Sequence, residues 1–182
     1  MATRPTHAVS LEWKALCRDF FTGLQKEWPN LTRPGFPQLL YPPRGNYWIA
    51  TVSGYGMRPL FYVTVATRDP EDLRARNLEP YSYLSVGLLF PRDRAADFPK
   101  TYLEKRFKEC GIDEPLDYGP QKVKPGQPKS AQANYHAGVR HPDGGDIRAS
   151  GRWPIYDQWA AETAVKMKTV VDEVRAQLMR RP

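Results

Sequence analysis

Three amphipathic helical segments, separated by strand-like runs, constrain the fold of this chain more than any other sequence feature. Apolar residues recur at steps of three and four over residues 9–28, 97–110 and 154–179. In the first range, Trp13 and Phe20 belong to one broad apolar face, whereas the charged residues fall on the other. A helix with one apolar face must cover another apolar surface. The three segments therefore predict a sheet beneath them.

Runs of β-branched and aromatic residues predict that sheet. Residues 46–52 and 60–66 are joined by a short, glycine-bearing link, which is typical of a β-hairpin. A third strand is predicted at 81–90 and a weaker fourth at 131–139, where Ala, Asn and Gly are poor strand formers. Strands and helices do not alternate strictly. The order therefore favours an α+β fold, in which a mostly antiparallel four-stranded sheet is covered by three helices.

A chain of 182 residues accommodates one domain, which we expect over residues 9–179. Residues 112–130 are rich in proline and lysine and predict a basic loop within this domain. Pro29 is expected to end the first helix and Gly111 the second. Residues 141–145, His-Pro-Asp-Gly-Gly, predict a turn.

Cysteine usage and hydropathy indicate the cellular compartment. Cys17 and Cys110 fall on apolar faces of predicted helices, which is typical of buried, unreactive thiols. The first ten residues hold no apolar run of the kind that a signal peptide requires, and no stretch approaches the ~20 apolar residues of a membrane span. We therefore expect a cytoplasmic protein without a membrane partner.

The sequence contains no recognisable catalytic pattern. His136, His141, Asp143 and Asp146 are close together, but their spacing matches no established metal-ligand pattern. No serine has the Gly-x-Ser-x-Gly setting of a nucleophile elbow. A metal-dependent nuclease needs carboxylates that converge on a cation, and the third predicted strand carries none. We therefore assign no catalytic residue, no metal and no cofactor, and the pattern favours a protein that is not an enzyme.

The formal net charge of +7 favours association with polyanions such as nucleic acid. Basic residues gather in one stretch, and two nearby tyrosines are of the kind that stack on exposed bases. The predicted nucleic-acid-binding residues are Lys122, Lys124, Lys129, Arg140, Arg148, Arg152, Tyr118 and Tyr135. The alternative interpretation is a solvated basic loop without a ligand, because many basic proteins bind no nucleic acid.

Several short segments carry a family resemblance. They are Phe20 and Phe21, the run Tyr-Trp-Ile-Ala-Thr-Val-Ser-Gly at 47–54, Val-Ala-Thr-Arg at 65–68, Gly-Asp-Ile at 145–147, Trp153 and Trp159. On these positions the chain resembles an uncharacterised bacterial family, known only as a domain of unknown function. Its members stand alone or follow restriction-endonuclease-like nucleases. The resemblance implies a defence-related or DNA-associated context, and it transfers no catalytic residue.

Three functional hypotheses follow. The first is a non-catalytic accessory or binding module of nucleic-acid processing or phage defence, which contacts DNA or RNA through residues 122–152. The second is a protein-interaction subunit, either a homodimer or the partner of a larger enzyme, in which exposed aromatic residues such as Tyr55 matter more than lysines. The third is a cryptic metal-dependent nuclease.

Overall fold

The structure, a computed structural model of the chain, describes residues 11–39, 48–51, 60–65, 84–120 and 134–180. Five strands form one sheet in the spatial order β1-β2-β3-β5-β4, and each neighbouring pair is antiparallel. The strands are β1 (Trp48–Ala50), β2 (Leu60–Val65), β3 (Leu84–Pro91), β4 (Asp117–Pro120) and β5 (Asn134–Arg140). The predicted α+β class and the antiparallel sheet are confirmed.

The sheet contains one strand more than the four that we predicted. The additional strand, β4, uses residues 117–120 of the stretch predicted as a loop, and it pairs with β5 at the edge of the sheet. Asp117 lies opposite Gly138, and Pro120 lies opposite Tyr135. Asp, Gly and Pro are poor strand formers. The strand therefore forms because β5 offers it an edge, and a proline is tolerated on an edge strand.

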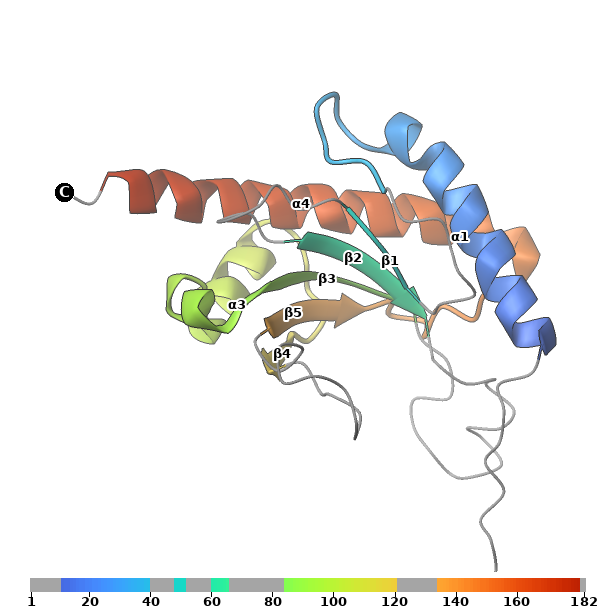
Figure 1. Ribbon diagram of the computed structural model, residues 1–182, viewed down its shortest axis with the longest axis horizontal. Coiled ribbons are helices and arrows are strands. Elements are labelled where there is room, and N and C mark those ends of the chain that lie inside the picture. The colour runs from blue at the N-terminus through green and yellow to red at the C-terminus, as the bar shows by residue number, and fades with distance from the viewer. Residues whose placement is uncertain (1–10, 40–47, 52–59, 66–83, 121–133, 181–182) are drawn as a thin grey trace, which may run out of the picture.

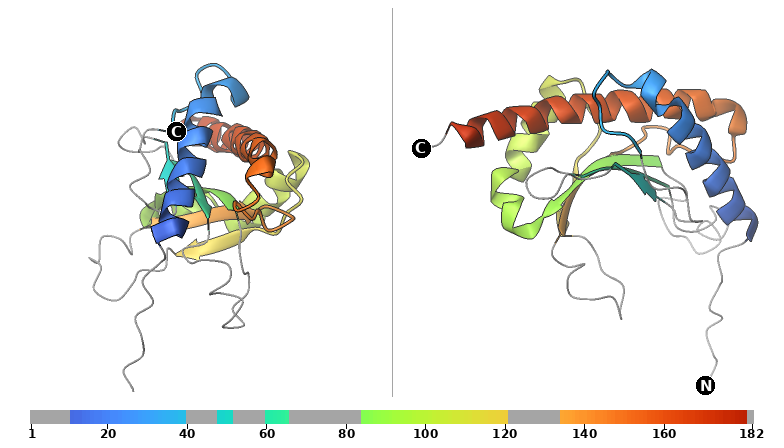
Figure 2. Two further views of the ribbon diagram at one scale, coloured as in Figure 1. Left: turned by 90° about the vertical axis from the view of Figure 1, so that its right-hand side faces the viewer. Right: turned by 45° about the horizontal axis from the view of Figure 1, so that its top comes forward.

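Helices cover one face of this sheet (Figures 1 and 2). The long helix α4 runs along this face. Helix α1 crosses α4 near the N-terminal end of α4, where the ring centroids of Phe20 and Trp153 lie 5.6 Å apart. The α-helices are α1 (Leu11–Leu31), α3 (Lys100–Glu109) and α4 (Trp153–Met179), and the 3-10 helices are η1 (Arg92–Asp97) and η3 (Ser150–Arg152). None of the helices in the described ranges combines the length and apolar character that crossing a bilayer requires.

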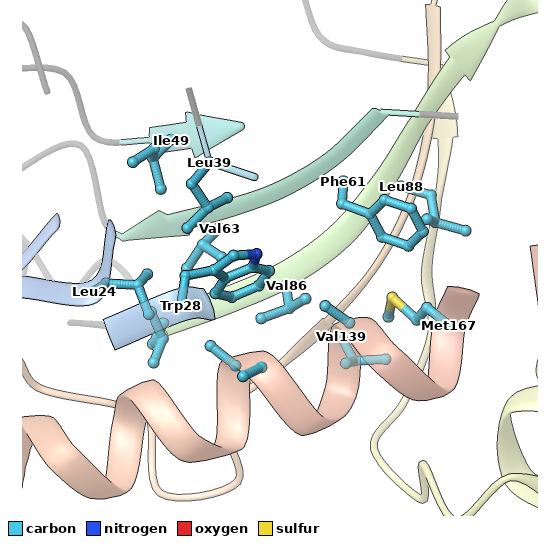
Figure 3. Packing of buried hydrophobic residues seen from close by; sticks show 14 of the residues in the cluster. Leu24, Trp28, Leu39, Ile49, Phe61, Val63, Val86, Leu88, Val139 and Met167 are labelled. Carbon is cyan, nitrogen blue, oxygen red and sulfur yellow. The ribbon is translucent and has the colours of Figure 1, made fainter. Parts of the chain in front are cut away.

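Alternating strand residues build the core between the sheet and the helices. Phe61 and Val63 of β2, Val86 of β3 and Val139 of β5 are buried on the face toward α4 (Figure 3). Trp28 of α1 is fully buried in the same layer, and its indole N–H donates a hydrogen bond to the carbonyl of Pro37 at 3.1 Å. This alternation follows from the two-residue repeat of a strand.

The first helix extends beyond the position at which we expected it to stop. It passes through Pro29 and ends at Leu31. A proline in the last turn removes only one helical hydrogen bond, because its missing N–H affects a single carbonyl. The carbonyl of Trp28 still accepts bonds from the backbone N–H and the hydroxyl of Thr32, at 3.0 and 2.7 Å. The helix therefore gains a further turn despite the proline.

Tyr62 and two glycines characterise the second face of the sheet. Tyr62, Gly87 and Gly138 are directly opposite one another on three adjacent strands. A Cβ atom added at Gly87 would lie 2.6 Å from the Tyr62 ring, and one added at Gly138 would lie 2.7 Å from its hydroxyl oxygen. The tyrosine therefore lies across both neighbouring strands, and it requires the absence of side chains at these positions.

Candidate nucleic-acid interface

The described members of the predicted binding set lie at two opposite ends of the sheet. Tyr135 is near the start of β5, whereas Arg140 is its last residue. The seven residues of β5 separate the two ends by about 20 Å, given the rise per residue of a strand. The predicted set therefore does not form one continuous patch.

Strand β5 ends at one end of the sheet, and we call this end "the turn end". The chain continues there into the predicted turn at 141–145, which is confirmed by the left-handed backbone of Gly144 and Gly145, with φ of 81° and 64°. The backbone N–H of Gly144 donates to the carbonyl of His141 at 2.9 Å and closes the turn. Arg148 and Arg152 follow this turn, so they lie on the same side of the molecule as Arg140.

Each arginine of the turn end has a carboxylate partner. The guanidinium of Arg140 lies 3.6 Å from Asp117, that of Arg148 lies 2.6 Å from Asp146, and that of Arg152 lies 2.8 Å from Asp143. The hydrogen bond from Arg152 is the main cause that lowers the pKa of Asp143. The local field of these three cations is therefore largely compensated.

Tyr118 and Tyr135 are half-buried and pack with Phe90. The ring centroids of Tyr118 and Tyr135 lie 6.2 and 6.3 Å from that of Phe90. The Tyr118 hydroxyl donates to the carbonyl of Phe98 at 3.0 Å, and burial is the main cause that raises its pKa. Both rings support the protein interior here, whereas a stacking platform needs an exposed ring face.

Three of the predicted residues lie outside the described ones: Lys122, Lys124 and Lys129. The strands on either side of their segment are described. Their segment joins Pro120, the last residue of β4, to Asn134, the first residue of β5. Asn134 is paired with Pro91 at the end of β3. The three lysines are therefore attached to the end of the sheet opposite the turn end.

Four arginines surround this opposite end, which we name the basic end. They are Arg92 and Arg94 of η1, Arg175 of α4, and Arg180, which follows α4. The helix and the strands meet here, because Pro91, Arg94 and Arg175 line one pocket (Figure 1). Arg94 pairs with Asp97 at 3.2 Å. Within the described ranges, no ion pair involves Arg92, Arg175 or Arg180.

Sequence reasoning did not assign Arg175 and Arg180 to a binding surface. Both belong to a helical pattern more than forty residues beyond the predicted lysines, so their proximity depends on how α4 packs on the sheet. The signal available in the sequence was the placement of basic residues at the C-terminal end of a helix, which the helix dipole also explains.

The net positive charge is unevenly distributed along the chain. The described ranges contain 17 Lys and Arg against 16 Asp and Glu, whereas the other residues contain ten against four. Almost the whole surplus thus belongs to segments outside the described ranges. Two of them, 52–59 and 121–133, are joined to strand ends at the basic end, since Leu60 pairs with Leu89 near the end of β3.

The histidines and aspartates that we considered as metal ligands contact different residues and do not converge on one point. His136 lies 3.3 Å from Asp117, whereas the ring of His141 is buried against Tyr156 and Trp159. Burial lowers the pKa of His141, which favours the neutral ring. In the part of the chain that the structure describes, no three His, Cys, Asp or Glu residues are arranged to hold a metal ion.

Comparisons of this chain with protein-family models, with curated proteins and with solved structures find no match.

Proposed function

We propose that this chain is an accessory nucleic-acid-binding module, of the kind that serves nucleic-acid processing or phage defence, and that its basic end contacts the nucleic acid. The observation that carries the proposal is the contrast between the two ends of the sheet. Arginines of the turn end are matched by carboxylates, whereas Arg92, Arg175 and Arg180 have no carboxylate partner among the described residues. Phosphate binding requires cations whose charge is not already compensated.

Chain connectivity adds to this contrast. Lys122, Lys124 and Lys129 belong to the segment that leaves β4 and returns to β5 at the basic end. Basic residues from several separate parts of the sequence are thus attached to one end of the molecule. A local surplus of positive charge raises the concentration of polyanions near it and speeds their association.

The test is a binding titration with fluorescently labelled DNA and RNA, each single-stranded and double-stranded, over a range of salt concentrations. Charge reversal in the triple variant Lys122→Glu, Lys124→Glu, Lys129→Glu should weaken binding more than tenfold. The slope of log K against log salt should fall by roughly 2, because each lost phosphate contact contributes about 0.7 to 0.9. Unchanged affinity and slope in the triple variant would remove the lysines from the proposed surface.

Purification from a native lysate separates this function from the two alternatives. Co-purified nucleic acid, seen as a raised ratio of absorbance at 260 and 280 nm, supports the proposal. A stoichiometric protein partner without nucleic acid would instead favour an interaction subunit. Tyr55, which we considered as a contact for it, lies outside the described residues; among the described ones, Leu11 and Ile155 are exposed apolar candidates. Cleavage of the labelled substrates only when a divalent metal is present would identify a nuclease.

A further inference from the structure

Four polar side chains converge on the face of the sheet that α4 does not cover (Figure 2). Gly138 of β5 lies at the centre of this cluster and adds no side chain of its own. His136 and Arg140 lie two residues before and after it on β5, and Asp117 lies opposite it on β4. Tyr62 reaches the same place from β2, since its hydroxyl oxygen lies 2.7 Å from the position of a Cβ atom at Gly138. The two-residue repeat of a strand places all four side chains on one face.

Asp117 connects two members of the cluster. Its Oδ1 atom lies 3.3 Å from Nε2 of His136, and its Oδ2 atom lies 3.6 Å from Nη2 of Arg140. An ionised carboxylate only accepts hydrogen bonds, so Nε2 carries the proton and Nδ1 of the neutral ring is an acceptor. Among the described residues, Nδ1 has no hydrogen-bond partner. His136 is therefore oriented to take a proton from a ligand.

The cluster is accessible to a large ligand. The side chains of Asp117 and Arg140 are 55% and 46% exposed, whereas that of His136 is more sheltered at 22%. The planar guanidinium of Arg140 matches the oxygens of a phosphate group. A base, a hydroxyl group and a cation on one rigid surface are the groups that a transfer reaction at phosphorus uses.

The nucleophile for such a reaction has to come from outside the cluster's own serine. Ser85 pairs with Arg140 in the register, but it is buried and its hydroxyl donates to the carbonyl of Val139 at 2.9 Å. Water or a neighbouring group of the substrate must then attack. RNA carries such a group, because each ribose has a 2′-hydroxyl beside the phosphorus atom. A reacting group held in place is far more effective than one that arrives from solution.

We propose that this cluster cleaves RNA through its 2′-hydroxyl, with His136 as the general base and Tyr62 as the general acid. The choice of RNA rests on the proposed function, which it extends from binding to cleavage. Nδ1 of His136 takes the proton of the 2′-hydroxyl, and the 2′-oxygen forms a bond to the adjacent phosphorus.

The bond from phosphorus to the 5′-oxygen breaks in the same reaction, and this oxygen takes the proton of the Tyr62 hydroxyl. Arg140 binds a non-bridging phosphate oxygen. The products are a 2′,3′-cyclic phosphate and a 5′-hydroxyl, and proton transfer from His136 to Tyr62 through water restores the site.

Incubation with labelled single-stranded RNA in excess EDTA tests the proposal. We expect cleavage of the RNA, with cyclic phosphate ends identified by mass spectrometry, whereas 2′-O-methylated RNA of the same sequence should bind and stay intact. His136→Asn and Tyr62→Phe should each lower the rate about hundredfold or more, the lower limit for a general acid or base. Tyr102→Phe is the matched control, because it removes a hydroxyl from α3, which packs against α4, and it should cleave like the wild type.

The same samples separate this inference from the proposed function. RNA that is bound but stays intact in EDTA would overturn the cleavage reaction and leave the proposed function in place. Equal cleavage by the wild type and His136→Asn would assign the activity to a contaminating nuclease and overturn the inference as well. Absence of both binding and cleavage would overturn both proposals. Thermal unfolding checks that each variant is folded.

Discussion

Asp157 is a buried carboxyl group in the first half of α4. It is 7% exposed, and its Oδ1 atom has no hydrogen-bond partner in the described structure. Burial is the main cause that raises its pKa to about 7, and the nearby charge of Glu27 on α1 adds to the effect. The ionised form is therefore unfavourable in the folded protein.

Stability should consequently fall as the pH rises. Between about pH 4 and pH 7 the unfolded chain has released this proton while the folded chain keeps it, so the free energy of unfolding decreases through that range. Asp157→Asn should abolish this decrease. Since one pKa unit corresponds to about 1.4 kcal/mol, the variant should be more stable than the wild type at pH 8 by an amount on the order of 2 to 4 kcal/mol.

Urea denaturation at pH 5 and pH 8 measures this difference. Asp19→Asn provides the control, because the Asp19 side chain is 66% exposed on α1. A pH dependence in Asp157→Asn equal to that of the wild type would show that Asp157 is not the titrating group.

Gly87 and Gly138 both lie under Tyr62. Substitution by alanine should nevertheless lower the stability of the protein by different amounts at the two positions, because an added Cβ atom would meet different neighbours. A Cβ at Gly138 would lie 2.7 Å from the hydroxyl oxygen of Tyr62, and the nearest backbone atom would be the carbonyl oxygen of Val86 at 3.2 Å. A Cβ at Gly87 also lies 2.8 Å from the backbone carbonyl of Ala137, which is held in the sheet. Overpacking of this kind costs roughly 1 to 3 kcal/mol.

We therefore expect Gly87→Ala to destabilise the protein more than Gly138→Ala. Adding Tyr62→Ala should remove most of the cost of Gly138→Ala, because its remaining backbone contact at 3.2 Å is the less severe one, and leave much of the cost of Gly87→Ala in place. Denaturant unfolding of the single and double variants gives both coupling energies. Equal rescue at the two glycines would contradict the backbone clash at Gly87.

Arg106 connects two helices, α3 and α4. Its Nε and Nη2 atoms donate to the carboxylate of Glu173, with N···O distances of 3.0 and 2.7 Å, and it also pairs with Glu109 within α3. These hydrogen bonds raise the pKa of Arg106. A two-pronged contact holds a helix pair in one register more firmly than a single ion pair does.

A double-mutant cycle with Arg106→Ala and Glu173→Ala should give a coupling energy of about 1 kcal/mol in low salt, near the upper limit for an exposed pair. The coupling should shrink in 1 M NaCl, because salt screens exposed charges. Lys100 and Glu104, an exposed pair within α3 at 3.4 Å, provide the comparison and should show a smaller value. A coupling at Arg106 no larger than this would mean that the contact does not hold α3 to α4.

At the turn end the arginines are paired with carboxylates, whereas at the basic end most are not. Variants that remove positive charge at one end only can test whether this difference affects nucleic-acid binding. Neutralising Arg140, Arg148 and Arg152 to Gln removes the same formal charge as neutralising Lys122, Lys124 and Lys129 to Gln. If only total charge mattered, the two triple variants would bind nucleic acid equally weakly.

We expect the arginine variant to keep its affinity within about threefold, since its cations are already paired with Asp117, Asp146 and Asp143. The lysine variant should lose more than that, together with part of its salt dependence. Thermal unfolding of both variants checks that they remain folded. A larger loss in the arginine variant would move the proposed interface to the turn end.

Local patterns in the sequence were sufficient for the fold class, the three α-helices and four of the five strands. The α+β class, the antiparallel hairpin, the turn at 141–145 and the buried Cys17 all follow from residue periodicity and turn chemistry, and the structure confirms them. These features depend on neighbours within a few residues along the chain, so a single sequence contains the information.

Contacts between residues that are far apart in the sequence decided the features that we did not predict. The edge strand β4 exists because β5 offers it hydrogen bonds, although its own residues favour a loop. Only packing of α4 on the sheet brings Arg175 to the end of β3, and only the sheet register sets Asp117 beside Arg140. Charge compensation depends on distance in space, and periodicity along the chain does not contain that distance. Local sequence patterns therefore determined most of the elements, and the tertiary structure decided the edge strand β4 and which charges remain available to a ligand.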